Sequence, residues 1–348
     1  MAKLIYRRAE PEDSEALCDL LRRTPMGSRI RVTQERVGDF FTSAAVQSEE
    51  PEVRAAFERA TGNAVGLFSA GASRVFLNGS LQRVRYLSDL RIDEAYRKGT
   101  LLARGYRLLR DEVFSDGEWA RTLILEDNGE AAQILTDGRA GLPEYHPCGT
   151  YLSWFLARQR VSGSATGIST RWAEAGDQAL MRSFFQEVGP DAEFTRWDDF
   201  HPVEGVRRLL AFRDGGLVGL LGVRDTSSFR RTRITSYNHT IRVARPFYNS
   251  WAKLHGLPRL PPAGGFLSPK ALGPVLCHER DPAILRTMLA EVLSESGLHA
   301  IGLDAADPLV AALEGLKAWK TRAGHYLVGF SGEPPELKRP FSFDFAHL

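Results

Sequence analysis

The chain has 348 residues, of which 43% are hydrophobic and 25% charged, and its formal net charge is +2 at neutral pH. This length predicts two or three domains, and the composition is that of a chain able to bury a full core. A charge so close to zero gives no reason to expect a nucleic acid as partner.

Cys18, Cys148 and Cys277 are odd in number and far apart, which favours reduced thiols in the cytoplasm over a disulfide framework. No run approaches the roughly 18 apolar residues that a spanning helix needs, and no apolar signal region precedes the first strand-like segment. We therefore expect a cytoplasmic protein without a membrane partner.

The first elements in chain order are a strand over 3–8, a helix over 11–22, and two strands over 53–58 and 64–70 separated by Thr61-Gly62-Asn63. Acidic residues open the helix, and the turn residues between the strands are typical of a tight connection. A succession of this kind predicts a mixed α/β domain.

The most informative stretch follows, over residues 82–113. Hydrophobic and charged side chains alternate from Val84 to Ile92, which indicates a half-buried strand, and beyond Gly99 the period changes to that of a helix. Arg97-Lys98-Gly99-Thr100 lies between the two, where free backbone N–H groups and the positive end of a helix dipole attract anions. The predicted ligand of this turn is a phosphate group.

The sequence contains neither a Gly-rich run ending in Lys-Ser/Thr nor a triple-glycine dinucleotide fingerprint. Leu90-Arg91-Ile92 followed by Tyr-Arg-Lys-Gly-Thr-Leu instead resembles the pyrophosphate-binding motif of the GNAT superfamily of N-acetyltransferases. Two positions depart from that motif: Arg97 lies only two residues before Gly99, and Leu101 stands where Gly or Ala is usual. The resemblance therefore implies a turn that is one residue tighter, or phosphates that bind slightly differently.

The rest of the first half predicts a buried strand over 121–126, a short helix over 128–136 and a last strand over 151–157. Together with the earlier elements this order resembles the whole GNAT fold from about residue 3 to residue 157. Glu126-Asp127-Asn128 then stands where the family often has the Asn of an Asn-x-x-Ala motif.

The polar, aperiodic segment 158–167 predicts a linker between domains 1–157 and 168–330, with a tail over 331–348. The second half repeats the element order of the first, so it resembles a degenerate GNAT domain. The expected fold class is thus α/β (α+β), with two tandem GNAT-like domains, each a mixed, mostly antiparallel twisted sheet flanked by helices. Its expected elements are strands over 169–173, 208–212, 217–223, 275–278, 300–303 and 325–330, and helices over 178–188, 282–292 and 308–316.

The second copy has Asp281 as predicted N-cap and Pro282 at the first helical position. The carboxylate occupies the dipole end and the proline removes one N–H group, so we expect no coenzyme there. An insertion over 239–270, rich in aromatic residues, is predicted to pack over the domain interface or to form a substrate wall.

The resemblance implies acyl transfer from acetyl-CoA to an amine, with coenzyme contacts on the strand and on the turn that follows it. The implied coenzyme-binding residues are Leu90, Arg91, Ile92, Arg97, Lys98, Gly99, Thr100, Leu101, Leu102 and Asn128. The eight histidines include no paired spacing, so no metal site is expected.

The candidate general bases are Asp89 on the motif strand and Glu126 at the end of the next strand, and a water chain without a dedicated base is a third option. Asp89 is alternatively a partner of Arg85 or Arg91, and Asp127 a helix cap.

Leu135 occupies the position of the family's frequent acid, so Tyr145 is the nearest substitute and His146 an alternative proton carrier. Cys148 as a covalent nucleophile has only its location in its favour.

Three classes of function follow. The first is a tandem-GNAT N-acetyltransferase acting on a small-molecule or peptide amine. The second is an aminoacyl or acyl transferase of the same architecture with a tRNA-borne donor, against which the near-neutral charge argues. The third is a non-catalytic acyl-CoA-binding protein.

Overall fold

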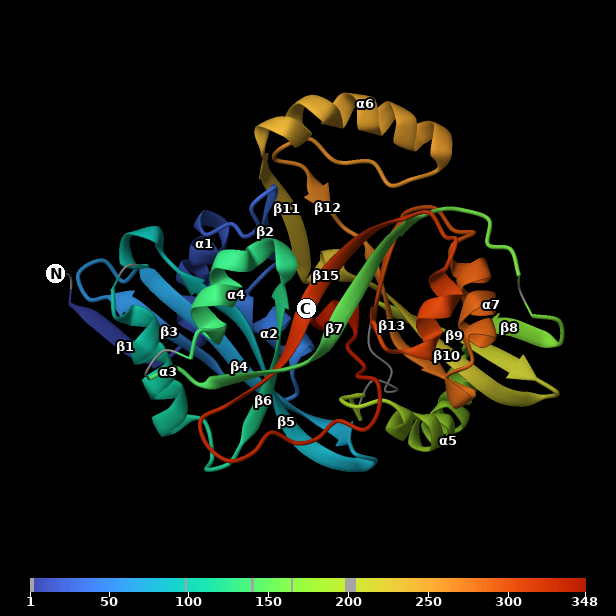
Figure 1. The fold of residues 1–348 in the computed structure, drawn as a ribbon, viewed down its shortest axis with the longest axis horizontal. Helices are drawn as coiled ribbons and strands as arrows, with labels where there is room; N and C mark the ends of the chain where they lie inside the picture. The colour runs from blue at the N-terminus through green and yellow to red at the C-terminus, as the bar shows by residue number, and fades with distance from the viewer. Residues whose placement is uncertain (1–2, 98, 139–140, 164, 198–204) are drawn as a thin grey trace.

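A computed structural model describes residues 3–97, 99–138, 141–163, 165–197 and 205–348. Its centre is a single twisted sheet of 12 strands in the order β1-β3-β4-β5-β6-β15-β7-β14-β13-β10-β9-β8, with helices on both faces (Figure 1). The sheet is antiparallel except at the pairs β5–β6 and β13–β14, which are parallel. The predicted mixed, mostly antiparallel fold class is confirmed.

The elements of the first half follow the predicted order, with one strand and one helix between residues 30 and 47 that the sequence did not predict. They are β1 (Leu4–Arg8), α1 (Ser14–Arg23), β2 (Ile30–Arg36), α2 (Phe40–Gln47), β3 (Val53–Glu58), β4 (Ala64–Leu77), β5 (Ser80–Ile92), α3 (Leu101–Glu112), β6 (Trp119–Leu125), α4 (Gly129–Thr136) and β7 (Glu144–Ala157).

The second half repeats this plan with one large addition. Its elements are β8 (Ile168–Trp172), α5 (Gln178–Val188), β9 (Val206–Arg213), β10 (Gly216–Asp225), β11 (Arg230–Tyr237), α6 (His239–His255), β12 (Phe266–Leu267), β13 (Lys270–Cys277), α7 (Pro282–Val292), β14 (Leu298–Asp304) and β15 (Ala318–Gly329). The helix expected over 308–316 is a shorter 3-10 helix, Pro308–Leu313. The sequence did not predict that β11 forms a separate sheet with β12 and β2 of the first half.

The last strands of the two halves are exchanged. β15, the last strand of the second half, pairs with β6 of the first half, from Ala323↔Leu125 to Gly329↔Trp119. β7, the last strand of the first half, pairs with β14 of the second half and also with β15. The two halves therefore share one sheet, and the segment 158–167 joins strands at different places within it.

Residues that alternate along the strands bury opposite faces of the sheet, as the two-residue period of a strand requires. Leu220 and Leu221 of β10 are both fully buried, but the first packs with Phe185 of α5 and the second with Ile284 of α7. In the same way α1 and α2 cover one face of the first half, while α3 and α4 cover the other.

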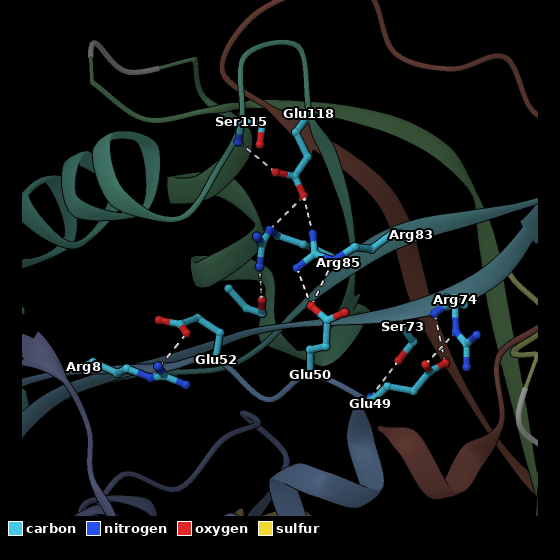
Figure 2. A network of polar contacts seen from close by, with 11 residues as sticks. Arg8, Glu49, Glu50, Glu52, Ser73, Arg74, Arg83, Arg85, Ser115 and Glu118 are labelled. Carbon is cyan, nitrogen blue, oxygen red and sulfur yellow. Dashed lines mark hydrogen bonds and ion pairs between the residues drawn. The ribbon is translucent and has the colours of Figure 1, made fainter.

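Ion pairs hold the connection between α2 and β3 to the neighbouring strands (Figure 2). Arg83 Nη2 lies 2.7 Å from Glu50 Oε2, and Arg85 Nε lies 2.8 Å from Glu118 Oε1. Glu118 also lies 3.6 Å from Arg83, so it bridges the two arginines. This network fixes one end of β5, the strand that carries the site described next.

Candidate active site

Strands β5 and β6 are paired at one end and separate at the other. Their ladder is limited to Arg85↔Ala120 and Tyr86↔Arg121, although β5 continues to Ile92 and β6 to Leu125. The hydroxyl of Thr122 donates to the carbonyl of Leu87 at 2.8 Å, just beyond the last pair. Further on, β5 and β6 no longer pair, so the backbone groups of β5 that face β6 have no strand partner.

A bulge in β5 accompanies this separation. The register with β4 shifts where Leu67 and Ser69 pair with Arg91 and Ser88, so β5 has one extra residue there. Asp89 lies within the bulge at a φ of 53°, which Asp tolerates better than most residues. A bulge of this kind bends the strand and increases its local twist.

Asp89 forms a buried ion pair. Its two carboxylate oxygens accept from Nη2 of Arg36 at 2.6 and 2.7 Å, and the hydroxyl of Ser69 donates at 3.2 Å. The Arg36 side chain is 0% exposed and that of Asp89 2%. As a general base, Asp89 would have to give up this pair, so the geometry favours a positioning role over the predicted catalytic one.

A cavity of about 830 Å³ occupies the opening between β5 and β6. Both halves of the chain line it: β5, β6 and α3 from the first, β11, α6 and β15 from the second. Most of the lining is apolar. The predicted site residues among the lining are Asp89, Leu90, Arg91, Ile92, Leu101, Leu102, Glu126, Asn128 and Tyr145.

Helix α3 begins at Leu101 without a side-chain cap. The N–H groups of its first turn are therefore available to an anion. A β-carbon on Gly66 of β4 would lie 2.6 Å from Leu101 Cδ2, so Gly66 allows this helix end to approach the sheet closely.

Gly99 does not have a positive φ, and a β-carbon on it would meet only the Tyr96 carbonyl oxygen, at 3.4 Å. The protein itself therefore does not require glycine at this position. Arg97, Gly99 and Thr100 are exposed and lie outside the cavity lining, beside its α3 end, and Lys98 lies outside the described residues.

Glu126 and Asp127 follow β6 but have different environments. The Glu126 side chain is 56% exposed and accepts from Arg322 Nε of β15 at 3.0 Å. Asp127 accepts from the hydroxyl of Ser28 at 2.7 Å and from the backbone N–H groups of Ser28 and Arg29. Burial alone would raise the pKa of Asp127, but these hydrogen bonds lower it below its usual value. Asp127 thus anchors the 27–29 loop, and Asn128 borders the cavity where α4 begins.

Tyr145 lies at the cavity wall, and its hydroxyl shares a short hydrogen bond with that of Tyr106 on α3. Burial, followed by the neighbouring phenol of Tyr106, raises the pKa of Tyr145 well above its usual value. Tyr145 therefore remains a neutral hydrogen-bond donor. Leu135 packs in the adjacent core and also lines the cavity, whereas His146 is exposed and lies outside the lining.

Cys148 lies beside a histidine that the sequence did not associate with it. Its Sγ is 3.2 Å from Nδ1 of His325, which is fully buried. Burial raises the pKa of the Cys148 thiol to about 12 and holds that of His325 well below its usual range. Both groups are neutral at pH 7, so this contact lacks the thiolate that a nucleophilic cysteine needs.

The equivalent place in the second half is filled. β13 and β14 pair from Lys270↔His299 to Leu272↔Ile301 and then separate, but the space between them contains residues 341–344 of the C-terminal segment. Only about 10 Å³ remains. The side chain of Asp281 caps α7 by accepting from the N–H of Ala283 at 2.8 Å, as predicted.

Sequence reasoning missed Arg36 and Tyr106, which orient predicted residues, and the wall contributed by β15. The strand exchange that brings β15 to this site has no local sequence signal. Among the described residues, no group of three His, Cys, Asp or Glu side chains is arranged to hold a metal ion. A membrane-spanning helix would have to be long and almost wholly apolar, and the described part of the chain contains none of that kind.

No protein-family model matches the sequence, and no curated protein is significantly similar to it. Solved structures do share its fold. Saccharomyces cerevisiae N-myristoyltransferase with bound myristoyl-CoA has a TM-score of 0.58 at 11% identity, over 96% of this chain and 84% of that chain. A GCN5-related N-acetyltransferase from Sphaerobacter thermophilus has a TM-score of 0.54 at 13% identity, over 99% of this chain and 98% of that chain. Another GCN5-related N-acetyltransferase, from Anabaena variabilis, has a TM-score of 0.52 at 10% identity, over 93% of this chain and 72% of that chain.

These similarities extend over most of the chain and thus include both halves. The predicted resemblance is confirmed at the level of the fold: the protein has the GNAT fold, in a tandem arrangement.

Proposed function

We propose that this chain is a coenzyme A-dependent N-acyltransferase that transfers an acetyl group from acetyl-CoA to the amine of a small molecule or peptide. The observation that carries the proposal is the separation of β5 from β6 over a large cavity, with the uncapped start of α3 at one side. An extended ligand with an anionic end matches both features, and coenzyme A has a long pantetheine arm attached to a diphosphate.

In this proposal the pantetheine arm lies against Leu90, Arg91 and Ile92 as an additional strand would. The diphosphate binds the backbone of residues 97–102, where the dipole of α3 and the side chain of Arg97 favour negative charge. Asn128 borders the arm from the β6 side. Burial lowers the pKa of Arg91, whose Nη1 donates to the Leu90 carbonyl at 2.8 Å inside the site.

The reaction forms a bond from the amine nitrogen to the thioester carbon and breaks the carbon–sulfur bond. The amine must be neutral when it attacks, and its proton must finally reach the thiolate of coenzyme A. Glu126 is the exposed carboxylate of the site and accepts the amine proton, directly or through water. Tyr145, held by Tyr106, donates a hydrogen bond to the departing sulfur.

A longer acyl group is a second candidate, because the cavity is larger and more apolar than an acetyl group needs. Its apolar wall continues past Tyr86 of β5 to Tyr151 and Phe155 of β7 and to Phe345. The yeast N-myristoyltransferase structure that shares this fold contains bound myristoyl-CoA. Chain length is therefore a variable that the test must include.

The test is calorimetric titration of the purified protein with coenzyme A, acetyl-CoA and acyl-CoAs of increasing chain length. Release of free thiol would then be followed with a panel of amines and peptides. The proposal expects binding of one coenzyme per chain and amine-dependent thiol release, fastest with acetyl-CoA. Faster release with a long-chain donor would favour the second candidate. Binding without turnover would favour a sensor, and no binding would exclude both transferase forms and leave a tRNA-borne donor to be tried.

A further inference from the structure

The outer face of α6 carries an exposed apolar stripe. Val243, Phe247, Trp251 and Leu254 are 55%, 74%, 48% and 83% exposed, and they are the four most exposed large hydrophobic residues of the described chain. Their spacing of four, four and three positions puts them on one side of the helix. Figure 1 shows α6 at the edge of the molecule, away from the large sheet.

The segment of chain that contains this helix is basic. Residues 226–278, which include all of α6, contain eight Lys or Arg residues and no Asp or Glu. The rest of the chain has 37 Lys or Arg against 43 Asp or Glu, so the near-neutral total hides a basic segment on an acidic body. Arg242 and Lys253 are exposed and lie about three turns apart, on one flank of the stripe.

The inner face of α6 is tied to the protein, which fixes the outward direction of the stripe. Asn249 and Leu260 form two hydrogen bonds. Nδ2 of Asn249 donates to the Leu260 carbonyl at 2.9 Å, and the N–H of Leu260 donates to Oδ1 of Asn249 at 2.8 Å. The hydroxyl of Tyr248 donates to the Pro258 carbonyl at 3.0 Å and accepts from Trp319 of β15. The stripe is therefore not a surface that the helix could bury by rotating.

We propose that α6 docks the protein on the surface of an anionic lipid bilayer, with the stripe in the acyl–headgroup boundary and the basic residues on the headgroups. A helix with Phe, Trp and Leu on one side, Lys and Arg beside them and no acidic residue is suited to lie in that interface. The acidic body is repelled by the same lipids, which leaves α6 as the face that approaches them.

Two other occupants fit the surface less well. A second copy docked by the same face would bring the exposed cations of two α6 helices together, which opposes association. A nucleic acid would use the basic and aromatic residues but would gain nothing from the aliphatic Val243 and Leu254.

Docking by α6 has a consequence for the cavity. Ile241 and Tyr248 of the same helix belong to its lining, so the membrane surface lies next to the proposed site. This link rests on the proposed function, whereas docking itself does not. Membrane binding and acyl transfer can thus fail separately, and separate assays distinguish them.

The experiment is co-sedimentation of the full chain with vesicles of phosphatidylcholine alone and of phosphatidylcholine mixed with phosphatidylglycerol. Binding is expected with the anionic vesicles, and it should weaken as salt is added. Arg242→Gln with Lys253→Gln should weaken it about 30-fold, at about 1 kcal/mol for each charge. Phe247→Ser with Leu254→Ser should weaken it by more than about tenfold.

Matched controls lie elsewhere on the surface. Arg158→Gln with Arg160→Gln removes the same charge from the exposed inter-half connection, and Leu180→Ser removes a 40% exposed leucine from α5. Neither should change vesicle binding. If an α6 variant fails to fold, tryptophan fluorescence provides the independent readout. The emission of the wild-type protein should shift when vesicles are added, and this shift should be lost in Trp251→Phe.

Four results would overturn the proposal: no binding to anionic vesicles, binding that the α6 variants leave intact, loss of binding in the controls to the same extent, or RNA binding or dimerisation that depends on the stripe while vesicle binding does not.

Discussion

Nη2 of Arg36 donates to both carboxylate oxygens of Asp89 while the two side chains are almost completely sealed from solvent. Arg36 ends β2, and Asp89 forms the bulge of β5 that opens the cavity. The same guanidinium donates to Ser43 Oγ of α2 at 3.0 Å. The pair therefore connects the shape of the proposed coenzyme groove to an element on the opposite face of the sheet.

Breaking this pair should destabilise the protein strongly. Arg36→Met leaves a buried carboxylate without its partner, and the expected loss in the free energy of unfolding is about 3–5 kcal/mol. Urea denaturation measures it. The matched control is Arg171→Met, which breaks a similar pair with Asp177 that is 45% exposed on the arginine side and should cost no more than about 1 kcal/mol.

The same variants separate positioning from catalysis at Asp89. If Asp89 only positions the bulge, Arg36→Met and Asp89→Asn should reduce coenzyme binding and turnover together. Normal coenzyme affinity with turnover abolished in Asp89→Asn alone would instead make Asp89 the general base.

Gly99→Glu should abolish coenzyme binding without unfolding the protein. The φ of Gly99 is not in the left-handed region and its surroundings leave room for a side chain, so folding does not depend on glycine there. A carboxylate at this turn would repel the diphosphate. Gly176→Glu, at an open position in the connection between β8 and α5, is the control. Calorimetry that found unchanged affinity in Gly99→Glu would place the phosphates elsewhere.

Cys148 should be chemically inert. With a pKa of about 12, on the order of one thiol in ten thousand is ionised at pH 8, so alkylation by iodoacetamide should be very slow. A cysteine introduced by Ser250→Cys on exposed α6 is the reactive reference, followed by mass spectrometry. Cys148→Ala should keep most of the turnover, and a complete loss in a folded variant would restore the nucleophile hypothesis.

Stability should fall as the pH drops below about 6.5, because buried histidines stay neutral in the folded state. Burial, followed by the charge of Lys270, lowers the pKa of His299 to about 4, and burial holds those of His325 and His347 well below the usual range. The unfolded chain binds protons at these residues before the folded chain does. Each contributes up to about 1.4 kcal/mol of lost stability per pH unit.

Urea denaturation between about pH 7 and pH 5 tests this slope. His299→Met should reduce the slope by the contribution of one histidine, whereas His146→Gln, at an exposed position, should leave it unchanged. Equal slopes in both variants would show that carboxylates, and not buried histidines, control acid stability.

The sequence predicted well whatever depends on local pattern. Alternation along residues 84–92 and the stripe after Gly99 predicted β5 and α3, and Asp281-Pro282 predicted the start of α7. Cys148 and His325, by contrast, are 177 positions apart, and their contact follows from the pairing of β7 with β15. Arg36 was missed for the same reason, since its partner lies 53 positions away.

The exchange of β7 and β15 also governs the order in which the chain can be completed. β6, which borders the proposed site, finds its outer neighbour in residues 318–329, which are synthesised long after the first half. When the whole first half has left the ribosome, its sheet still has an open edge at β6, and the cavity still lacks the wall that β15 will form. We expect the nascent first half to need protection from edge-to-edge pairing until the last strand arrives. Expressing residues 1–167 alone should give aggregated material, whereas co-expression with 168–348 should restore a soluble complex.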